Sequence, residues 1–356
     1  MISPILAQLA AIAASLLGIS FIIVFHEFGH YIFCKLFNIY TPTFSIGIGK
    51  ILYSKKIGDT DFCVSAGPIG GYVEIASEEG INGSLGFNQV PYWQKVLIML
   101  GGIFCNFLLS YLLFVCLFWT GMPESAAGSY EPCTTKISSV APTSPNAQIL
   151  QPNDELISLN HQEINHDLSN ARKIIMQHAS TDTQLPAQVI RDGQTHEVMV
   201  NLHGKGTPPS LSRQLELSFE LKPTLSLAES IKQAWYATIF YTQAIIAGLK
   251  NMFHARTTQG FVGPLMAVAA SSKSAQKGIS YLLFFLAIIS INLGFMNLLP
   301  LPIFDGGQFV IFTVEAICRR QLSDRMRHII GTSSWVMAIG LLVIFTIRDL
   351  QALIFG

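Results

Sequence analysis

Four long stretches without a charged residue constrain the fold of this chain more than any other feature. They cover residues 4–25, 96–122, 278–304 and 329–347. A helix that crosses a bilayer needs about 20 mostly apolar residues, and the four stretches reach or nearly reach that length. Charged residues make up only 12% of the 356 positions, whereas soluble domains carry about 25%. The sequence therefore predicts a polytopic α-helical membrane protein with about four transmembrane helices.

A fifth apolar run, residues 233–249, is shorter and mixes aromatic with polar side chains. Its length favours an amphipathic helix at the membrane interface, with a fifth span as the alternative. The basic residues favour four spans, because two basic loops then fall on one side, which the positive-inside rule assigns to the cytoplasm. These residues are Lys35, Lys50, Lys55, Lys56 and Lys95 in one loop and Arg319, Arg320, Arg325 and Arg327 in the other.

The segment between the second and third stretches is as polar as a soluble domain. Short β-type runs at residues 137–140, 155–159, 188–190 and 197–202 alternate with turn residues, and residues 191–194 read as a hairpin turn. Residues 168–178 have helical spacing. This order of elements resembles a PDZ domain, so we expect an extracytoplasmic, PDZ-like α+β domain over residues 128–222. A plain spacer domain is the alternative.

The motif His26-Glu27-Phe28-Gly29-His30 ends the first apolar stretch. Positions i and i+4 of a helix share a face, so both imidazoles can point at one metal ion, with Glu27 as general base on a bound water. A charge at the bilayer centre costs about 2.5–3.5 kcal/mol, and a metal would compensate the polar groups in this span. The alternative is that these residues merely lie at the cytoplasmic interface.

The end of the third stretch, residues 297–307, reads NLLPLPIFDGG. Its two prolines break a helix, and irregular backbone at membrane depth is tolerated only where it is buried in protein or lines a wet cavity. Asp305 follows 27 uncharged residues, 278–304. A broken helix end with a lone carboxylate is a site candidate, although taken alone Asp305 also fits an ordinary Asp-Gly turn.

Together the two motifs resemble the site-2 protease family of intramembrane zinc metalloproteases, especially the bacterial regulators of envelope stress with periplasmic PDZ domains. The resemblance implies that Zn²⁺ is bound by His26, His30 and Asp305, and that Glu27 is catalytic. Asn297 matches a family position that contacts the substrate backbone.

Two further stretches resemble the same family. Residues 65–75, SAGPIGGYVEI, look like its membrane-associated β-hairpin. An edge strand there could pair with an unwound substrate, which marks Gly71, Tyr72 and Val73 as substrate-binding. Residues 260–264, GFVGP, resemble a stretch that precedes the third span.

The chain also departs from the family pattern. Ile103 stands where a proline is usual at the start of the second span, although Asn106 of that motif is kept. Phe304 replaces the leucine before the Asp-Gly pair. One PDZ-like domain fits this chain, whereas many envelope-stress enzymes have two. The role proposed for such a tandem pair, which selects substrates by length, therefore cannot be assigned to this chain.

These features predict three parts. Residues 1–122 carry two spans, HExxH and the hairpin, residues 128–222 the PDZ-like domain, and residues 223–356 the interfacial helix and the last two spans. The resemblance implies a multi-pass protease of the bacterial cytoplasmic membrane, with its active site towards the cytoplasm. It would cut membrane-protein substrates within a transmembrane helix, in regulated intramembrane proteolysis such as anti-sigma factor or signal-peptide remnant cleavage.

Other classes of protein fit less well. The zero net charge gives no electrostatic case for a nucleic-acid partner. A non-catalytic membrane adaptor with a PDZ-like domain is the main alternative, but degenerate relatives lose the glutamate or a histidine and this chain keeps all four site residues. A transporter would be expected to show internal repeats, and none is found. The sequence leaves the substrate, its cleavage position and the oligomeric state open.

Overall fold

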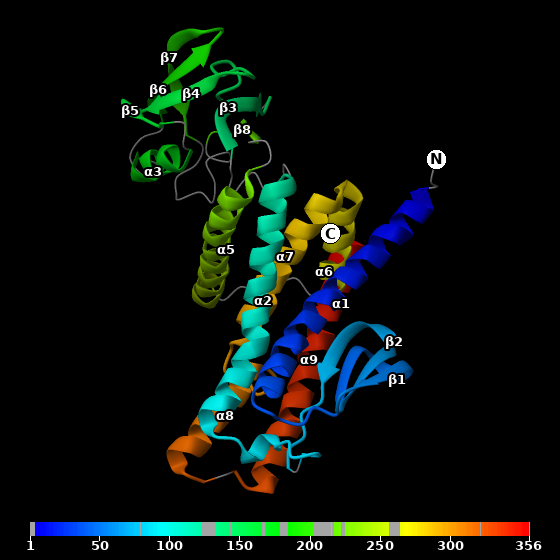
Figure 1. Cartoon of the computed structure of the whole chain (residues 1–356). Coiled ribbons are helices and arrows are strands. Elements are labelled where there is room, and N and C mark those ends of the chain that lie inside the picture. Colours follow the sequence, from blue (N-terminus) through cyan, green and yellow to red (C-terminus); the bar gives the residue numbers. More distant parts are fainter. Residues whose placement is uncertain are drawn as a thin grey trace. The chain divides into compact units, whose positions relative to one another are not determined.

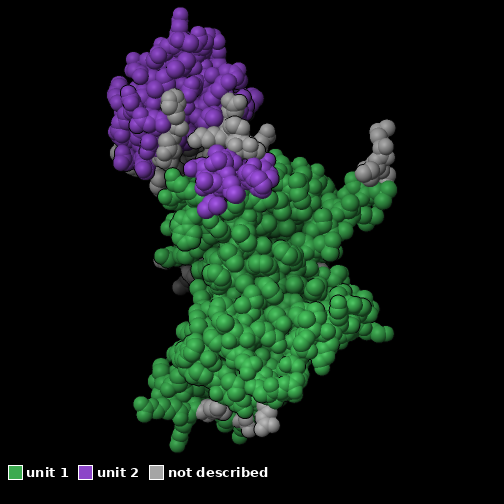
Figure 2. Space-filling model, viewed as in Figure 1, with its two compact units in different colours: residues 1–116, 232–356 green, residues 117–231 purple. Residues whose placement is uncertain are grey.

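The computed structural model describes residues 4–78, 80–122, 133–142, 144–165, 168–178, 184–202, 215, 217–221, 225–255, 264–320 and 322–355. The chain divides into two compact units (Figure 2). The first unit comprises Met1–Cys116 and Lys232–Gly356, and the second comprises Leu117–Ile231. The prediction of four spans concerns the helices of the first unit, and the predicted α+β domain falls within the second.

Among the described residues, four helices are long and apolar enough to cross a membrane. They are α1 (Pro4–Leu36), α2 (Tyr92–Thr120), α7 (Ile279–Asn297) and α9 (Asp324–Phe355) (Figure 1). The predicted number of spans is therefore confirmed by length and composition. The first helix is longer than the apolar stretch that predicted it. It continues past residue 25 through the HExxH motif to Leu36, because exposed Phe28, Ile32 and Leu36 extend its apolar face.

The third predicted span is shorter than its apolar stretch. Helix α7 ends at Asn297 rather than at residue 304, since Pro300 and Pro302 cannot continue a helix. A new helix, α8 (Asp305–Cys318), then begins at the lone carboxylate. The predicted break before Asp305 is thus confirmed, whereas α8 was not predicted.

Two further helices complete this part of the chain. Helix α5 (Leu227–Ala255) is longer than the run 233–249 that predicted it, and it is not among the four candidate spans. Its placement at the interface stays a prediction. Helix α6 (Pro264–Lys277) was not predicted, and it packs against α1. Residues 260–263 of the GFVGP stretch lie outside the described residues.

The predicted β-hairpin is confirmed and is longer than residues 65–75. Strands β1 (Thr43–Ile57) and β2 (Thr60–Val73) form a two-stranded antiparallel sheet, and β2 packs against α1. The pairing is irregular, because residues 44–46 of β1 pair with both 62–64 and 71–73 of β2, and Gly47 and Gly70 beside them adopt positive φ angles of 86° and 102°. Apolar side chains on the hairpin are exposed, namely Ile46, Ile48, Ile51, Leu52, Tyr53 and Ile57. Such a surface fits contact with lipid better than contact with water.

The second unit holds a six-stranded antiparallel sheet. Its order is β7-β6-β4-β3-β8, with β5 paired to β4. The strands are β3 (Cys133–Val140), β4 (Glu155–Leu159), β5 (Gln162–Glu163), β6 (Gln184–Arg191), β7 (Gln194–Asn201) and β8 (Leu217–Leu221). Helix α3 (Leu168–His178) contributes Ala171, Ile174 and Ile175 to the core that the strands build.

The sequence predicted this unit in some detail. All four expected strands are present, α3 has the expected bounds, and the hairpin turn pairs Arg191 with Gln194 through Asp192 and Gly193 at positive φ. An α+β domain is therefore confirmed, whereas its PDZ identity stays a prediction. Both predicted boundaries, residues 128 and 222, lie outside the described residues.

A buried ion pair stabilises the second unit. Arg191 donates to the Asp154 carboxylate at 2.7 and 2.8 Å and to the Ile149 carbonyl at 2.9 Å. Burial alone would raise the pKa of Asp154, but the hydrogen bonds from Arg191 and from the Gln151 N–H outweigh it and lower that pKa. This pair fixes the turn that precedes β4 against the end of β6.

Candidate metal centre

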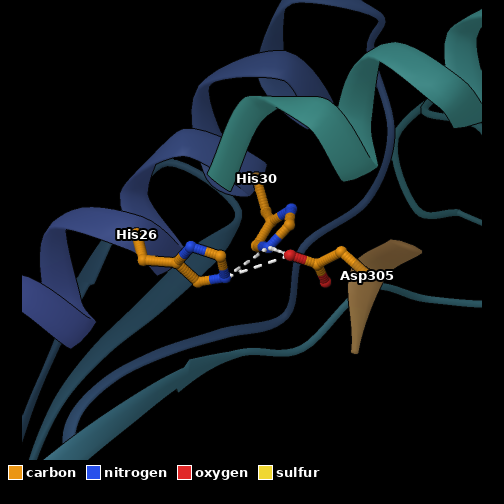
Figure 3. A group of neighbouring side chains, drawn as sticks. All are labelled: His26, His30 and Asp305. Atoms are coloured by element: carbon orange, nitrogen blue, oxygen red, sulfur yellow. Dashed lines mark hydrogen bonds and ion pairs between the residues drawn. The ribbon is translucent and has the colours of Figure 1, made fainter. Parts of the chain in front are cut away.

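Three side chains that the sequence places in two remote segments converge on one point (Figure 3). Asp305 Oδ2 lies 3.1 Å from His26 Nε2 and 3.4 Å from His30 Nε2, and the two Nε2 atoms lie 3.2 Å apart. Both histidines are buried, at 6% and 5% exposure. The three predicted ligands are thus brought together. No second group of three such side chains lies within the described ranges.

The local sequence explains how α1 presents its two histidines. Residues four apart lie on the same face of a helix, and the two rings face each other edge to face, with centroids 4.8 Å apart. The same face meets α2 at Gly29. A Cβ atom on Gly29 would lie 2.2 Å from the Gly101 carbonyl oxygen, and one on Gly102 would lie 2.4 Å from His30 Nε2. Glycine at these positions lets the two helices cross in direct contact beside the imidazoles.

Helix α2 also orients both rings. The Ile98 carbonyl lies 2.8 Å from His30 Nδ1, and because a carbonyl only accepts, Nδ1 carries the hydrogen and Nε2 has its lone pair free. The Asn106 carboxamide lies 2.9 Å from His26 Nδ1 and is fully buried. Asn106 itself is held by Ser290 of α7, whose hydroxyl donates to its backbone carbonyl at 2.7 Å.

The break between α7 and α8 positions Asp305. The residue opens α8, and the two glycines after it are buried. A Cβ on Gly306 would lie 2.4 Å from the Leu298 carbonyl oxygen, and one on Gly307 would lie 2.1 Å from the Leu301 carbonyl oxygen. The first turn of α8 therefore packs tightly on the 298–302 segment, which directs the carboxylate towards the histidines.

The chemistry of this donor set fits a zinc ion. Ligand atoms about 2.0–2.1 Å from a tetrahedral zinc are roughly 3.3 Å apart, and the three observed separations of 3.1, 3.2 and 3.4 Å agree with that value. Asp305 Oδ2 is buried and makes no hydrogen bond of its own. Two imidazoles and one carboxylate are a known catalytic zinc set, which leaves the fourth position for water or substrate.

Two of the predicted catalytic and substrate-binding residues make contacts here: Asn297 lies beside His26, and Glu27 is bonded by Val73. The Val73 N–H at the end of β2 donates to Glu27 Oε2 at 3.1 Å, so the hairpin fixes the direction of this carboxylate. Asn297 Nδ2 lies 3.4 Å from His26 Nε2. Gly71 packs closely on β1 and α1, since a Cβ there would lie 2.9 Å from the Ser45 carbonyl oxygen. Their contact with substrate stays a prediction.

Sequence reasoning missed the supporting residues on α2. Ile98 acts through its main chain and leaves no side-chain signal. Asn106 did leave a signal in the sequence. An unpaired buried amide is costly, so a lone carboxamide in an uncharged span indicates a hydrogen-bond partner nearby. His178 lies in the second unit and forms hydrogen bonds there with Asn160 and the Ile174 carbonyl.

Comparison with known proteins places the whole chain beside one family. The model of "Peptidase family M50" matches residues 14–341. A protein of Clostridium perfringens is 29% identical over 340 residues, which cover 94% of this chain and 97% of that protein. Proteins of Campylobacter jejuni and Helicobacter pylori are each 27% identical, over 357 and 350 residues, with at least 92% of each chain covered. All three carry the name "Putative zinc metalloprotease".

Proposed function

Because this chain belongs to peptidase family M50, we propose that it is a zinc-dependent protease that cuts peptide bonds within the membrane, with His26, His30 and Asp305 as its metal ligands. The observation that carries the proposal is the convergence of those three donor atoms at zinc-like separations. The four candidate spans around the site support its place in a bilayer. The complete donor set also argues against a non-catalytic adaptor.

Each residue of the site then has a separate role in hydrolysis. A bound zinc ion supplies Lewis acidity at the scissile carbonyl. Glu27 accepts the proton of the attacking water and delivers it to the leaving amine. The Val73 N–H holds one oxygen of this carboxylate, which fixes its direction. The Ile98 carbonyl keeps the hydrogen of His30 on Nδ1. The Asn106 carboxamide lies beside His26 Nδ1, where its oxygen would accept that hydrogen after a half-turn.

The substrate must present an unwound segment to this site. A transmembrane helix hides its carbonyls in i→i−4 hydrogen bonds, and freed amides are costly in an apolar environment. Residues Gly71, Tyr72 and Val73 of β2 pair with residues 44–46 of β1 on one edge, and their other edge would pair with the unwound strand. Asn297, next to His26, would bond the substrate backbone.

The remaining parts suggest the biological setting. The α+β domain of residues 128–222, if PDZ-like, would inspect substrates on the extracytoplasmic side of a bacterial inner membrane before the cut. Substrates of this kind include anti-sigma factors and signal-peptide remnants, processed in regulated intramembrane proteolysis. The basic loops favour an active site that opens towards the cytoplasm.

The position of the cleavage site in a membrane-protein substrate tests this function. Purified protein in lipid vesicles should cleave a tagged single-span substrate, and mass spectrometry of the fragments should place the cut within the span. A Gly-Pro pair introduced into that span should speed cleavage, because it lowers the cost of unwinding. A leucine-only span of equal length is the matched control. Cleavage confined to a soluble loop of the substrate would refute an intramembrane protease.

The Asn106 carboxamide should contribute to zinc affinity. With zinc on Nε2, His26 carries its hydrogen on Nδ1 and needs an acceptor, and a half-turn of the carboxamide brings its oxygen there. That oxygen, Asn106 Oδ1, makes no hydrogen bond in its present orientation. We expect Asn106→Leu to weaken zinc binding about 10–100-fold, measured by competition with a chelator.

Two variants control this experiment. Asn106→Asp restores an acceptor and should bind zinc more tightly than the leucine variant. Ser290→Ala removes the hydroxyl that supports the Asn106 backbone without touching the carboxamide, so it should change zinc affinity much less. Equal affinity of the aspartate and leucine variants would show that Asn106 does not accept from His26.

A further inference from the structure

A small cavity lies away from the metal centre, between the start of α2 and the end of α8. Its volume is about 200 Å³. The lining residues are Tyr92, Lys95, Phe312, Glu315, Ala316, Arg319 and Arg320. No step of the proposed hydrolysis uses these residues.

The cavity concentrates positive charge. Three of its side chains are cations, whereas Glu315 is its one acid, and the Glu315 carboxylate accepts the Leu322 N–H at 2.8 Å. Arg319 caps α8 in a left-handed conformation with φ of 50°, and the N–H groups of Arg319 and Arg320 bond the last carbonyls of that helix. The partial positive charge at the start of α2 and the partial negative charge at the end of α8 oppose each other here, so the side chains decide the sign of the cavity. An anion is therefore the ligand that this cavity suits.

The surroundings place this cavity at the level of lipid headgroups. It lies where the candidate span Tyr92–Thr120 begins, and Trp93 there is 53% exposed, as is typical of aromatic residues at a membrane interface. Helix α8 exposes Val310, Val314 and Ile317 on the face opposite the cavity, where an apolar stripe fits contact with lipid chains. A cationic cavity at the depth of the headgroups fits the phosphate of a phospholipid better than an anion from bulk water.

We propose that this cavity binds the headgroup phosphate of an anionic phospholipid and thereby holds α8 against α2. The two helices already touch here, since the Tyr92 hydroxyl lies 2.9 Å from Thr313 Oγ1 and the Lys95 ammonium lies over the rings of Phe87 and Phe312. An anion in the cavity would offset the mutual repulsion of Arg319 and Arg320, which follow each other at the end of α8. A neutral lipid offers no such compensation.

The consequence reaches the metal centre, because these two helices build it. Asp305 is the first residue of α8, and α2 carries Ile98 and Asn106, which face the histidines. A lipid that fixes α8 on α2 should therefore favour the assembled donor set. This effect on zinc rests on the proposed function, whereas lipid binding itself does not.

Native mass spectrometry tests the binding step. Protein released from phosphatidylcholine vesicles with phosphatidylglycerol should retain one phosphatidylglycerol molecule. The Arg319→Gln/Arg320→Gln variant should bind it about 25-fold more weakly, since each basic residue near a membrane surface contributes about fivefold. The Lys55→Gln/Lys56→Gln variant removes the same charge from the exposed hairpin tip and should bind as the wild type does. The Arg319→Lys/Arg320→Lys variant, which keeps the charge, should recover most of the affinity and separates charge from folding.

Further measurements identify the ligand and test its effect on zinc retention. Inorganic phosphate added to pure phosphatidylcholine vesicles should not replace the lipid, and equal competition by phosphate would overturn the lipid assignment. An equal loss of lipid affinity in Arg319→Gln/Arg320→Gln and in Lys55→Gln/Lys56→Gln would show a non-specific effect of surface charge. That result would also overturn the lipid assignment. Zinc retention against a chelator should rise with phosphatidylglycerol in the wild type and in the Lys55→Gln/Lys56→Gln control, but not in Arg319→Gln/Arg320→Gln. No rise in the wild type would show that the lipid does not hold α8 against α2. The lipid count needs no protease assay and should be unchanged in a Glu27→Gln variant, so a failure of the proposed function leaves this test intact.

Discussion

The Asp305→Ala variant is expected to lose its zinc while the wild-type protein holds one zinc ion per chain. Asp305 supplies the only negative charge among the three converging donors, and its Oδ2 atom has no other hydrogen-bond partner. Losing a partner of a metal ligand already costs about 10–100-fold in affinity, so losing a ligand should cost roughly a thousandfold or more. Elemental analysis of the detergent-purified protein measures the metal directly.

The control for this prediction removes a carboxylate at a position away from the metal centre. Asp192→Ala removes a carboxylate from the exposed turn between β6 and β7 and should leave the zinc content unchanged. Asp305→Asn keeps the shape of the side chain and removes its charge, so it should also bind zinc weakly. If the Asp305→Ala variant still binds one zinc ion tightly per chain, Asp305 is not a zinc ligand.

The sequence could predict the half of the site that is local. Two histidines four residues apart share a helix face whatever surrounds them, so His26 and His30 needed no tertiary information. The link to Asp305 is different, because the two motifs lie at opposite ends of the chain and no periodicity relates them. Only the family resemblance brought them together in the sequence analysis, and the structure supplies the distances.

The missed helices have a related explanation. Helix α6 carries serines and two lysines among its apolar residues, and α8 is 14 residues long, so neither gives the uncharged run that marks a span. The break before Asp305 was predicted because proline acts locally. The close approach of α1 and α2 at Gly29 and Gly101 was not, since a glycine in an apolar helix has no unique meaning without its partner.

Glu27→Gln should reduce the rate of peptide cleavage about 10²–10⁴-fold while the zinc content stays at one per chain. A general base contributes a factor of this size, and glutamine cannot accept the proton of the attacking water. The carboxamide keeps the shape of the side chain, and its oxygen can still accept the Val73 N–H that now bonds Glu27 Oε2. The fold and the metal ligands should therefore be unaffected.

Initial rates on a tagged transmembrane substrate, with zinc content measured on the same sample, check this expectation. Glu74→Gln makes the same chemical change just beyond β2, where the carboxylate accepts from the Thr43 hydroxyl at 2.8 Å, and it should cleave at nearly the wild-type rate. Full activity in Glu27→Gln would end its assignment as general base. Loss of zinc together with activity would instead make Glu27 part of the metal binding, because a pure proton acceptor changes the rate and leaves the ion in place. The pair of variants thus separates the two roles, since Asp305→Ala should lose both the metal and the activity, and Glu27→Gln only the activity.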